Sequence, residues 1–239
     1  MSSITWMPTE VASNRLSLHC TLWRATEAQH VVSTLPLVDT LDEQHELERL
    51  LEESKPPVPE RARGLHFLLF TPFRYPSPQG SRFRDPTEPG VFYGAEFVRT
   101  ACAELGYWRW CVLRDSPDLD RIDAKPQTVF RSSIACSAVD LRRVPFARDM
   151  PLWTHPTDYS SCQAFARVAR SASVDAITYQ SVRDPLAATA IAILTPTAFA
   201  SGEVEPTTWH LTVTRSTVFW HRDSPIDHDA FEFDMTRWA

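Results

Sequence analysis

Hydrophobic and polar positions along the chain follow patterns that predict several helices. A T-x-x-E capping box followed by leucines at helical spacing predicts a helix over residues 40–54. The proline-rich run 55–59 ends this helix, because proline cannot donate a backbone N–H. Further helices are expected over residues 95–108 and 158–172, the last with Asp158 as its N-cap.

Short apolar runs between these helices predict strands. Trp209, Leu211 and Val213 alternate with polar residues, a pattern typical of a strand with one solvated face, and Val218 and Trp220 indicate its hairpin partner. Other strands are expected at residues 65–70, 91–93, 107–113, 174–179 and 187–194. The mixture predicts an α+β fold with short strands and long irregular loops.

The proline-rich run also suggests a division of the chain. We expect residues 1–60 to form an N-terminal arm with one helix, and residues 61–239 to form the main domain. A chain of 239 residues, 43% of them hydrophobic, can bury a sizeable core. The helix of the arm is expected to serve structure or oligomerisation rather than catalysis.

Charge and cysteine content narrow the possible partners and compartments. A net charge of -6 without a long basic run argues against direct binding of nucleic acid. The five cysteines include no C-x-x-C pair, which argues against a disulfide framework or structural zinc and favours a reducing compartment. Residues 1–6 do not resemble a signal peptide, and no apolar stretch is long enough to span a bilayer. We therefore expect a cytoplasmic protein that does not contact membranes.

Candidate binding groups concentrate on either side of residue 80. Three of the six glycines fall between residues 80 and 94, and Arg74, Arg82 and Arg84 lie in or just before the same stretch. Guanidinium groups bind phosphate through two parallel N–H groups, so converging arginines would suit a pyrophosphate. A solvated loop that carries unrelated arginines is the alternative.

Glu104 is the main candidate for chemistry. On the expected helix it shares a face with Phe97, Ala101, Leu105 and Trp108. A carboxylate on an apolar face is either paired with a nearby cation or held in a cleft for catalysis, because burying an unpaired charge is costly. The pattern leaves both interpretations open.

These residues are similar to a known family. The runs 80–83, 89–96 and 100–104 resemble the RES domain, which is named for an arginine, a glutamate and a serine. The matching positions are Arg82, Glu104 and Ser181 for these three, Tyr93 midway between the first two, and the upstream pair Arg74 and Tyr75. The resemblance covers about residues 70–235, and Phe83 stands where the family often has tryptophan.

The resemblance implies an ADP-ribosyltransferase-like fold with a mixed or antiparallel β core and flanking helices. It also implies a bacterial toxin that degrades NAD by cleaving the nicotinamide–ribose bond, with ADP-ribose passing to water or to inorganic phosphate as co-substrate. NAD would be a substrate rather than a cofactor, since no glycine-rich Rossmann or Walker loop occurs. The implied partners are an Xre-type antitoxin and a second copy of the toxin. Transfer of ADP-ribose to a protein and a non-catalytic binding module are the alternatives.

The resemblance also assigns roles to residues. Glu104 would stabilise the positive charge that develops on the ribose. The other matched residues would contact substrate: Arg74 and Arg82 at the pyrophosphate or a phosphate acceptor, Tyr75 and Tyr93 at the nicotinamide ribose, and Ser181 at the nicotinamide amide or a ribose hydroxyl. Ser181 is not expected to be a nucleophile, because neither a G-x-S-x-G motif nor a base partner is evident.

No metal is expected. The C-terminal group of His221, Asp223, His228 and Asp229 lacks the close ligand spacing of a zinc site, and the aspartates of residues 118–123 lack the glycine of a calcium loop. Cys102 and Cys162 are expected in the core.

Overall fold

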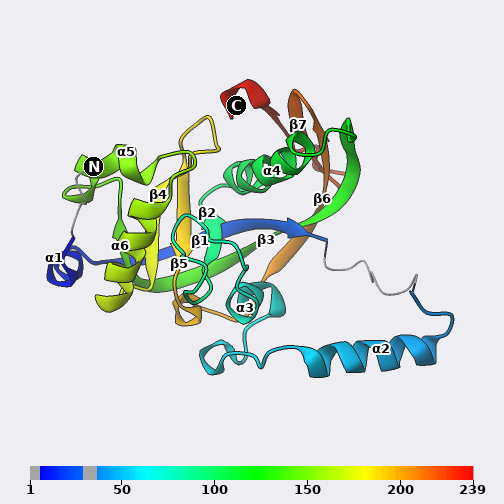
Figure 1. Cartoon of the computed structure of the whole chain (residues 1–239), viewed down its shortest axis with the longest axis horizontal. Helices are drawn as coiled ribbons and strands as arrows, with labels where there is room; N and C mark the ends of the chain where they lie inside the picture. The colour runs from blue at the N-terminus through cyan, green and yellow to red at the C-terminus, as the bar shows by residue number, and fades with distance from the viewer. Residues whose placement is uncertain (1–5, 29–36, 239) are drawn as a thin grey trace.

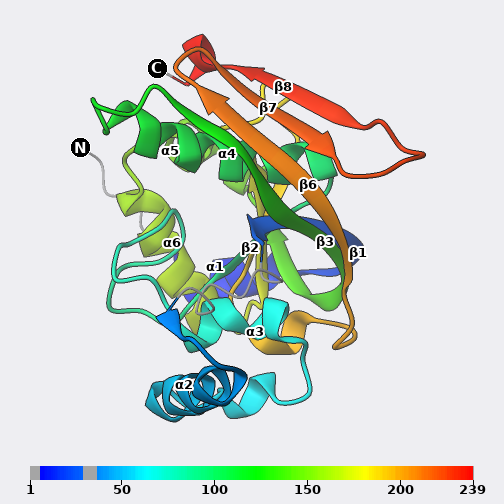
Figure 2. The ribbon, with the colours of Figure 1, turned by 90° about the vertical axis from the view of Figure 1, so that its right-hand side faces the viewer.

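The computed structural model describes residues 6–28 and 37–238, which form one eight-stranded sheet (Figure 2). Its strands are β1 (Leu16–Glu27), β2 (Phe92–Ala95), β3 (Arg121–Asp140), β4 (Ala176–Gln180), β5 (Thr189–Ile193), β6 (Glu205–Thr214), β7 (Thr217–Arg222) and β8 (Ala230–Asp234). Their order is β1-β2-β5-β4-β3-β6-β7-β8, and β1 also pairs with β3. The first five strands of this order therefore close into a ring.

The 20-residue strand β3 joins the ring to the rest of the sheet. Residues 127–138 of β3 pair with β1, and residues 121–131 pair with β6. The β3–β4 pairing is parallel and the other pairings are antiparallel. A mixed, mainly antiparallel sheet flanked by helices confirms the α+β fold expected from the sequence.

Helices cover the sheet on two sides (Figure 1). The α-helices are α1 (Pro8–Ser13), α2 (Leu41–Ser54), α3 (Phe67–Arg74), α4 (Val98–Arg114), α5 (Met150–Trp153) and α6 (Ser160–Ser171), with short 3₁₀ turns at Glu60–Ala62, Phe146–Asp149, Pro196–Ala198 and Met235–Arg237. α4 packs against β1 and β6, whereas α2 stands apart from the sheet. Among the described residues, none of the helices has the length and apolar character needed to cross a bilayer.

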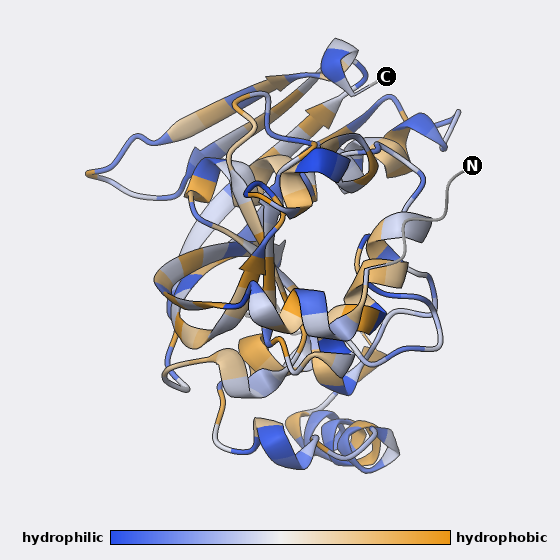
Figure 3. Cartoon of the chain, turned by 90° about the vertical axis from the view of Figure 1, so that its left-hand side faces the viewer, coloured by the Kyte–Doolittle hydropathy of each residue, from blue (hydrophilic) through white to orange (hydrophobic). Residues whose placement is uncertain are grey.

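Apolar side chains gather in three clusters, of which one lies among the ring strands, and the central strands are coloured as hydrophobic in Figure 3. The cluster beneath α6 contains Trp153, Phe165 and Tyr179, and a second beneath α4 contains Trp110 and Trp220. Cys102 and Cys162 are fully buried, as expected. The first cluster holds α6 against β4, and the second holds α4 against β6 and β7.

Several expected elements are confirmed. The helix over 40–54 is α2, and its capping box forms, with the Glu43 N–H donating to Thr40 Oγ1 at 3.2 Å. The strand of alternating residues is β6, and its hairpin partner is β7. The prediction that Asp158 is the N-cap of α6 was wrong, because the helix begins at Ser160 and Tyr159 is its N-cap. The Asp158 carboxylate instead accepts from the Ser160 N–H.

The predicted strand at residues 65–70 is wrong, because this run lies in α3. The imidazole Nδ1 of His66 accepts from the Leu68 N–H at 3.2 Å and so caps the helix. Leu68 and Leu69 are buried beneath it. A short apolar run suits a buried helix as well as a strand, and here the capping histidine favours the helix.

The predicted strand at residues 107–113 is also wrong, because α4 continues to Arg114. Tyr107, Trp110 and Cys111 are buried at helical spacing against β6 and β7. Packing on the sheet therefore overrides the preference of aromatic residues for strands.

The expected arm contains more structure than one helix. α1 and β1 both precede α2, and β1 pairs with β3 at twelve positions, from Leu16 opposite Ala138 to Glu27 opposite Gln127. This part of the arm is thus integral to the ring. The division at residue 60 stays a prediction, and residues 1–5 and 29–36, including most of the segment considered as a signal peptide, lie outside the described residues.

Gly90 marks a close approach of two backbones. A Cβ at this position would lie 2.0 Å from the carbonyl oxygen of Pro72 in α3. We expect Gly90→Ala to lower the free energy of unfolding by roughly 1–3 kcal/mol, because α3 would have to move away from β2. Gly80→Ala is the matched control, since its nearest contacts would be 3.2 Å. Equal denaturation midpoints for the two variants would contradict this packing.

Candidate active site

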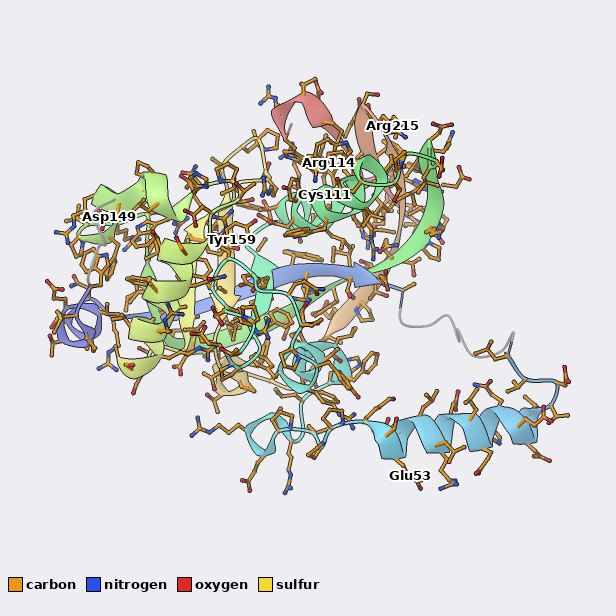
Figure 4. The ribbon with its side chains drawn as sticks, viewed as in Figure 1. Glu53, Cys111, Arg114, Asp149, Tyr159 and Arg215 are labelled. Carbon is orange, nitrogen blue, oxygen red and sulfur yellow. The ribbon has the colours of Figure 1, made fainter. Side chains whose placement is uncertain are left out.

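A cavity of about 510 Å³ lies where β1, β2 and β4 face α4. Further lining residues come from the loop of residues 77–82, from Tyr159 just before α6 and from Arg183 after β4. Figure 4 labels Tyr159 on the side of α6 that faces α4. The cavity thus collects residues from seven segments, which span residues 23–183.

Glu104 and Ser181 meet in this cavity. Ala101, Glu104, Leu105 and Trp108 of α4 line it, as the predicted helical face required. Phe97, which was predicted on the same face, is instead the exposed N-cap of α4. The Ser181 hydroxyl donates to the Glu104 carboxylate at 2.6 Å. The glutamate and the serine that the sequence singled out, 77 residues apart, are therefore direct partners.

The remaining hydrogen bonds of Ser181 bear on its chemistry. Its oxygen accepts from the backbone N–H groups of Arg183 at 3.3 Å and Asp184 at 3.1 Å. The hydroxyl donates its hydrogen bond to Glu104, and both lone pairs of its oxygen accept from backbone N–H groups. No lone pair of Ser181 is therefore free for nucleophilic attack. Glu104 does supply the carboxylate partner that the sequence did not reveal, but the arrangement still positions Glu104 rather than activating Ser181.

A second contact holds the turn of residues 181–184 against α4. Asp184, which is buried, accepts from the Thr100 hydroxyl at 2.7 Å and pairs with Arg99. The Trp238 indole N–H donates to the carbonyl of Arg183 at 2.7 Å and covers the turn. Residues of α4 therefore contact the segment 181–184 at two positions, Thr100 and Glu104, which lie about one helical turn apart. These two contacts set the position of Ser181 relative to Glu104.

Three arginines line the cavity and donate to neutral partners. Arg24 Nη1 donates to the Tyr93 carbonyl at 2.7 Å, and Arg82 Nη1 donates to two backbone carbonyls at 2.9 Å each. The guanidinium of Arg183 lies 3.5 Å from the centre of the Tyr107 ring. Among the described residues, none of the three forms an ion pair with a carboxylate within 4.0 Å. The cavity is consequently rich in positive charge.

Tyr93 holds the loop on which Arg82 lies. Its hydroxyl accepts from the Phe83 N–H at 2.9 Å and shares a hydrogen bond with the Ser81 hydroxyl at 2.8 Å. Burial raises the pKa of Tyr93 to about 12, so the phenol is neutral at physiological pH. The ring lines the cavity, and the hydroxyl fixes the loop of residues 81–83.

Arg74 and Tyr75 do not reach the cavity. Arg74 donates to the Pro56 carbonyl at 2.6 Å and pairs with Glu52 of α2 at 2.9 Å, so it ties α2 to α3. Tyr75 is exposed and packs beside the Arg74 guanidinium. Of the six predicted site residues, the structure brings Arg82, Tyr93 and Glu104 to the cavity lining, with Ser181 bonded to the carboxylate.

Arg24 and Arg183 are the basic residues that the sequence interpretation missed. Arg24 lies on β1, where the alternating run 16–22 could have indicated a strand, and Arg183 lies two residues after Ser181. Tyr159, whose ring lies 4.6 Å from the Arg82 guanidinium, had no recognisable signal. Burial lowers the pKa of Arg24 to about 10, which still leaves it charged at neutral pH.

The electrostatics of Glu104 reflect opposing effects. Burial raises the pKa of its carboxyl above the usual range, while the hydrogen bond from Ser181 and the charges of Arg82 and Arg183 act in the other direction. Burial is the largest of these effects. The site combines a cationic wall suited to an anion with a carboxylate suited to a developing positive charge.

A model of the RES domain family matches residues 58–214, which is more than half of the chain. The chain belongs to the RES domain family. The matched segment contains Arg82, Tyr93, Glu104 and Ser181, whereas Arg24 on β1 lies outside it. This confirms the resemblance noted from the sequence.

Two further comparisons add little. The crystal structure of the M. tuberculosis MbcT–MbcA toxin–antitoxin complex is similar at 13% identity and a TM-score of 0.49, over 87% of this chain and 90% of the matched chain. No curated protein matches the chain. Within the described residues of this RES protein, no three His, Cys, Asp or Glu side chains gather in a group that could hold a metal ion.

The raised pKa of Glu104 has a consequence for stability. Since the carboxyl ionises at a higher pH in the folded than in the unfolded state, folding loses stability as pH rises through the folded-state pKa. We expect Glu104→Gln to melt at the same or a higher temperature than the parent near neutral pH, with the gain shrinking in mild acid. Thermal denaturation across pH measures this, with the exposed Glu96→Gln as control. A Glu104→Gln protein that is less stable than the parent at neutral pH would contradict the burial of a charged group.

Proposed function

We propose that this RES protein cleaves the nicotinamide–ribose bond of NAD and acts as the toxin of a toxin–antitoxin pair. The observation that carries the proposal is the Glu104 carboxylate in the cavity, which accepts a hydrogen bond from Ser181 and is flanked by arginines that form no ion pair with a carboxylate of the described residues. Membership of the RES domain family supports it, because the family resemblance implies this reaction.

The residues suit the chemistry of the bond. The ring nitrogen of the nicotinamide in NAD carries a formal positive charge, so the electron pair of the breaking C1′–N bond neutralises it and no strong acid is needed. Positive charge then builds on the ribose, where the ionised Glu104 would stabilise it. An acceptor oxygen forms the new bond at C1′ and releases its proton. Products are nicotinamide and ADP-ribose, or its phosphorylated form.

The arginines supply the binding energy for the pyrophosphate. Arg82 and Arg183 are buried, and burying a cation without a counter-ion is costly. A diphosphate would offset this cost with charge-assisted hydrogen bonds. We assign this binding to Arg24, Arg82 and Arg183 and not to Arg74, which is engaged by Glu52. Tyr93 and Tyr159 would hold the arginine-bearing loop and the ribose end.

The acceptor and partners remain part of the proposal. Water and inorganic phosphate are both open as acceptors, and a protein acceptor is the second interpretation. The cognate partner would be an Xre-type antitoxin, with a homodimeric toxin within the complex. Incubation of the purified protein with labelled NAD, with and without phosphate, followed by mass analysis, separates the cases: free ADP-ribose, its phosphate, or label on protein.

The first functional prediction concerns Glu104. We expect Glu104→Gln to slow NAD cleavage by at least about 100-fold, because a neutral amide cannot stabilise the developing charge. Glu96→Gln removes an exposed carboxylate eight residues away and is expected to keep full activity. Rates of nicotinamide release measure both. Full activity of Glu104→Gln, with folding verified by circular dichroism, would contradict the catalytic role assigned to Glu104.

The second functional prediction concerns Ser181. Its hydrogen bond lowers the pKa of Glu104, so Ser181→Ala should raise that pKa further. If ionised Glu104 is the active form, activity falls as pH drops through its pKa, and the acid limb of the pH–rate profile moves to higher pH in the variant. A limb that stays in place or moves to lower pH would show that Ser181 does not act through Glu104.

A further inference from the structure

The cavity has two chemically different ends. One end carries Glu104 with Ser181, together with Arg82 and Tyr93, beside the cluster beneath α6. The other end is apolar and lies beside the cluster beneath α4. It is formed by Leu105 and Trp108 of α4 and by Trp23 and Ala25 of β1. The proposed reaction uses only the first end.

Trp108 is unusual for a large apolar side chain. It is 52% exposed although it lines a cavity, so most of one side of the indole is uncovered. Its ring meets the buried Tyr107 ring edge to face, with 5.3 Å between centroids. Leu105 and Trp23, by contrast, are partly buried against the cluster beneath α4. A supported aromatic ring with a free side inside a cavity offers a surface for stacking.

This aromatic surface lies in the same cavity as the reacting end. Trp108 lies four residues after Glu104 on the same face of α4, a rise of about 6 Å along the helix. Arg24 follows Trp23 on β1, and its guanidinium is fixed by the Tyr93 carbonyl at 2.7 Å. The same cavity therefore holds a carboxylate, cationic groups and an aromatic surface.

We propose that Trp108, backed by Leu105 and Trp23, stacks on the adenine base of the substrate. The inference rests on the proposed function and extends it to the other half of the molecule. A dinucleotide carries, in order, the nicotinamide ribose, the pyrophosphate and the adenosine. The cavity offers a partner for each of the three: Glu104, the arginines and Trp108. The adenosine half of NAD would then be held by an apolar wall that the proposed reaction does not use.

The kinetic test compares NAD with nicotinamide mononucleotide, which has the reacting bond but no adenosine. Base–aromatic stacking predicts that Trp108→Ala raises the KM for NAD by roughly tenfold or more and leaves kcat little changed. The constants for the mononucleotide should not change. Trp108→Phe keeps an aromatic surface and should restore most of the affinity. Val112→Ala, an exposed residue one turn further on the same helix, is the matched control and should match the parent.

A binding test is independent of catalysis. Calorimetric titration with ADP and with inorganic pyrophosphate compares probes that share a diphosphate and differ in the adenosine. Trp108→Ala should weaken ADP roughly tenfold and leave pyrophosphate unchanged. If the parent protein cleaves no NAD but Trp108→Ala still weakens ADP selectively, the base subsite stands and the proposed reaction is wrong. Equal effects on both probes, or no effect on ADP, would overturn the subsite whatever the catalytic result.

Discussion

A partly buried carboxylate that faces cations is the constraint on which this site depends. Burial raises the pKa of Glu104 and so favours its protonated form, while the hydrogen bond from Ser181 and the charges of Arg82 and Arg183 favour the ionised form. The same arginines lack carboxylate partners of their own within 4.0 Å among the described residues. The charges of the arginines thus lower the pKa of Glu104 without forming an ion pair with it. An anionic substrate would neutralise the positive charge that the arginines leave in the cavity.

The fold explains how groups so distant in sequence are kept in register. α4 grips the turn of residues 181–184 through Thr100, Arg99 and Glu104, so that the glutamate and the serine cannot move independently. Closure of the ring through the β1–β3 pairing brings Arg24 onto the same cavity. An N-terminal strand outside the segment matched by the family model therefore contributes to the site.

How much the sequence predicted depended on the kind of signal. Glu104 was identified because a lone carboxylate on an apolar helical face is conspicuous, and Arg82 because arginines cluster around the glycine-rich stretch, whereas Tyr93 and Ser181 followed from the resemblance to the RES domain. β1 was missed although Leu16, Leu18, Cys20 and Leu22 alternate with polar residues.

Other features had no local signature. The aromatic run 107–113 is helical because α4 packs on β6 and β7, and tertiary contacts of this kind cannot be seen in a short window of sequence. Arg183 and Tyr159 reach the cavity only through the fold. Arg74, by contrast, matched the family pattern and yet binds Glu52 on α2, in a helix that only the three-dimensional arrangement brings beside it.

The most direct test of the central claim is a crystal structure of the Glu104→Gln variant with NAD bound. The slowed variant should hold the intact dinucleotide. The arrangement described here predicts the nicotinamide ribose within hydrogen-bond distance of residue 104 and the pyrophosphate on Arg24, Arg82 and Arg183. NAD bound in the reverse direction, or outside this cavity, would contradict it.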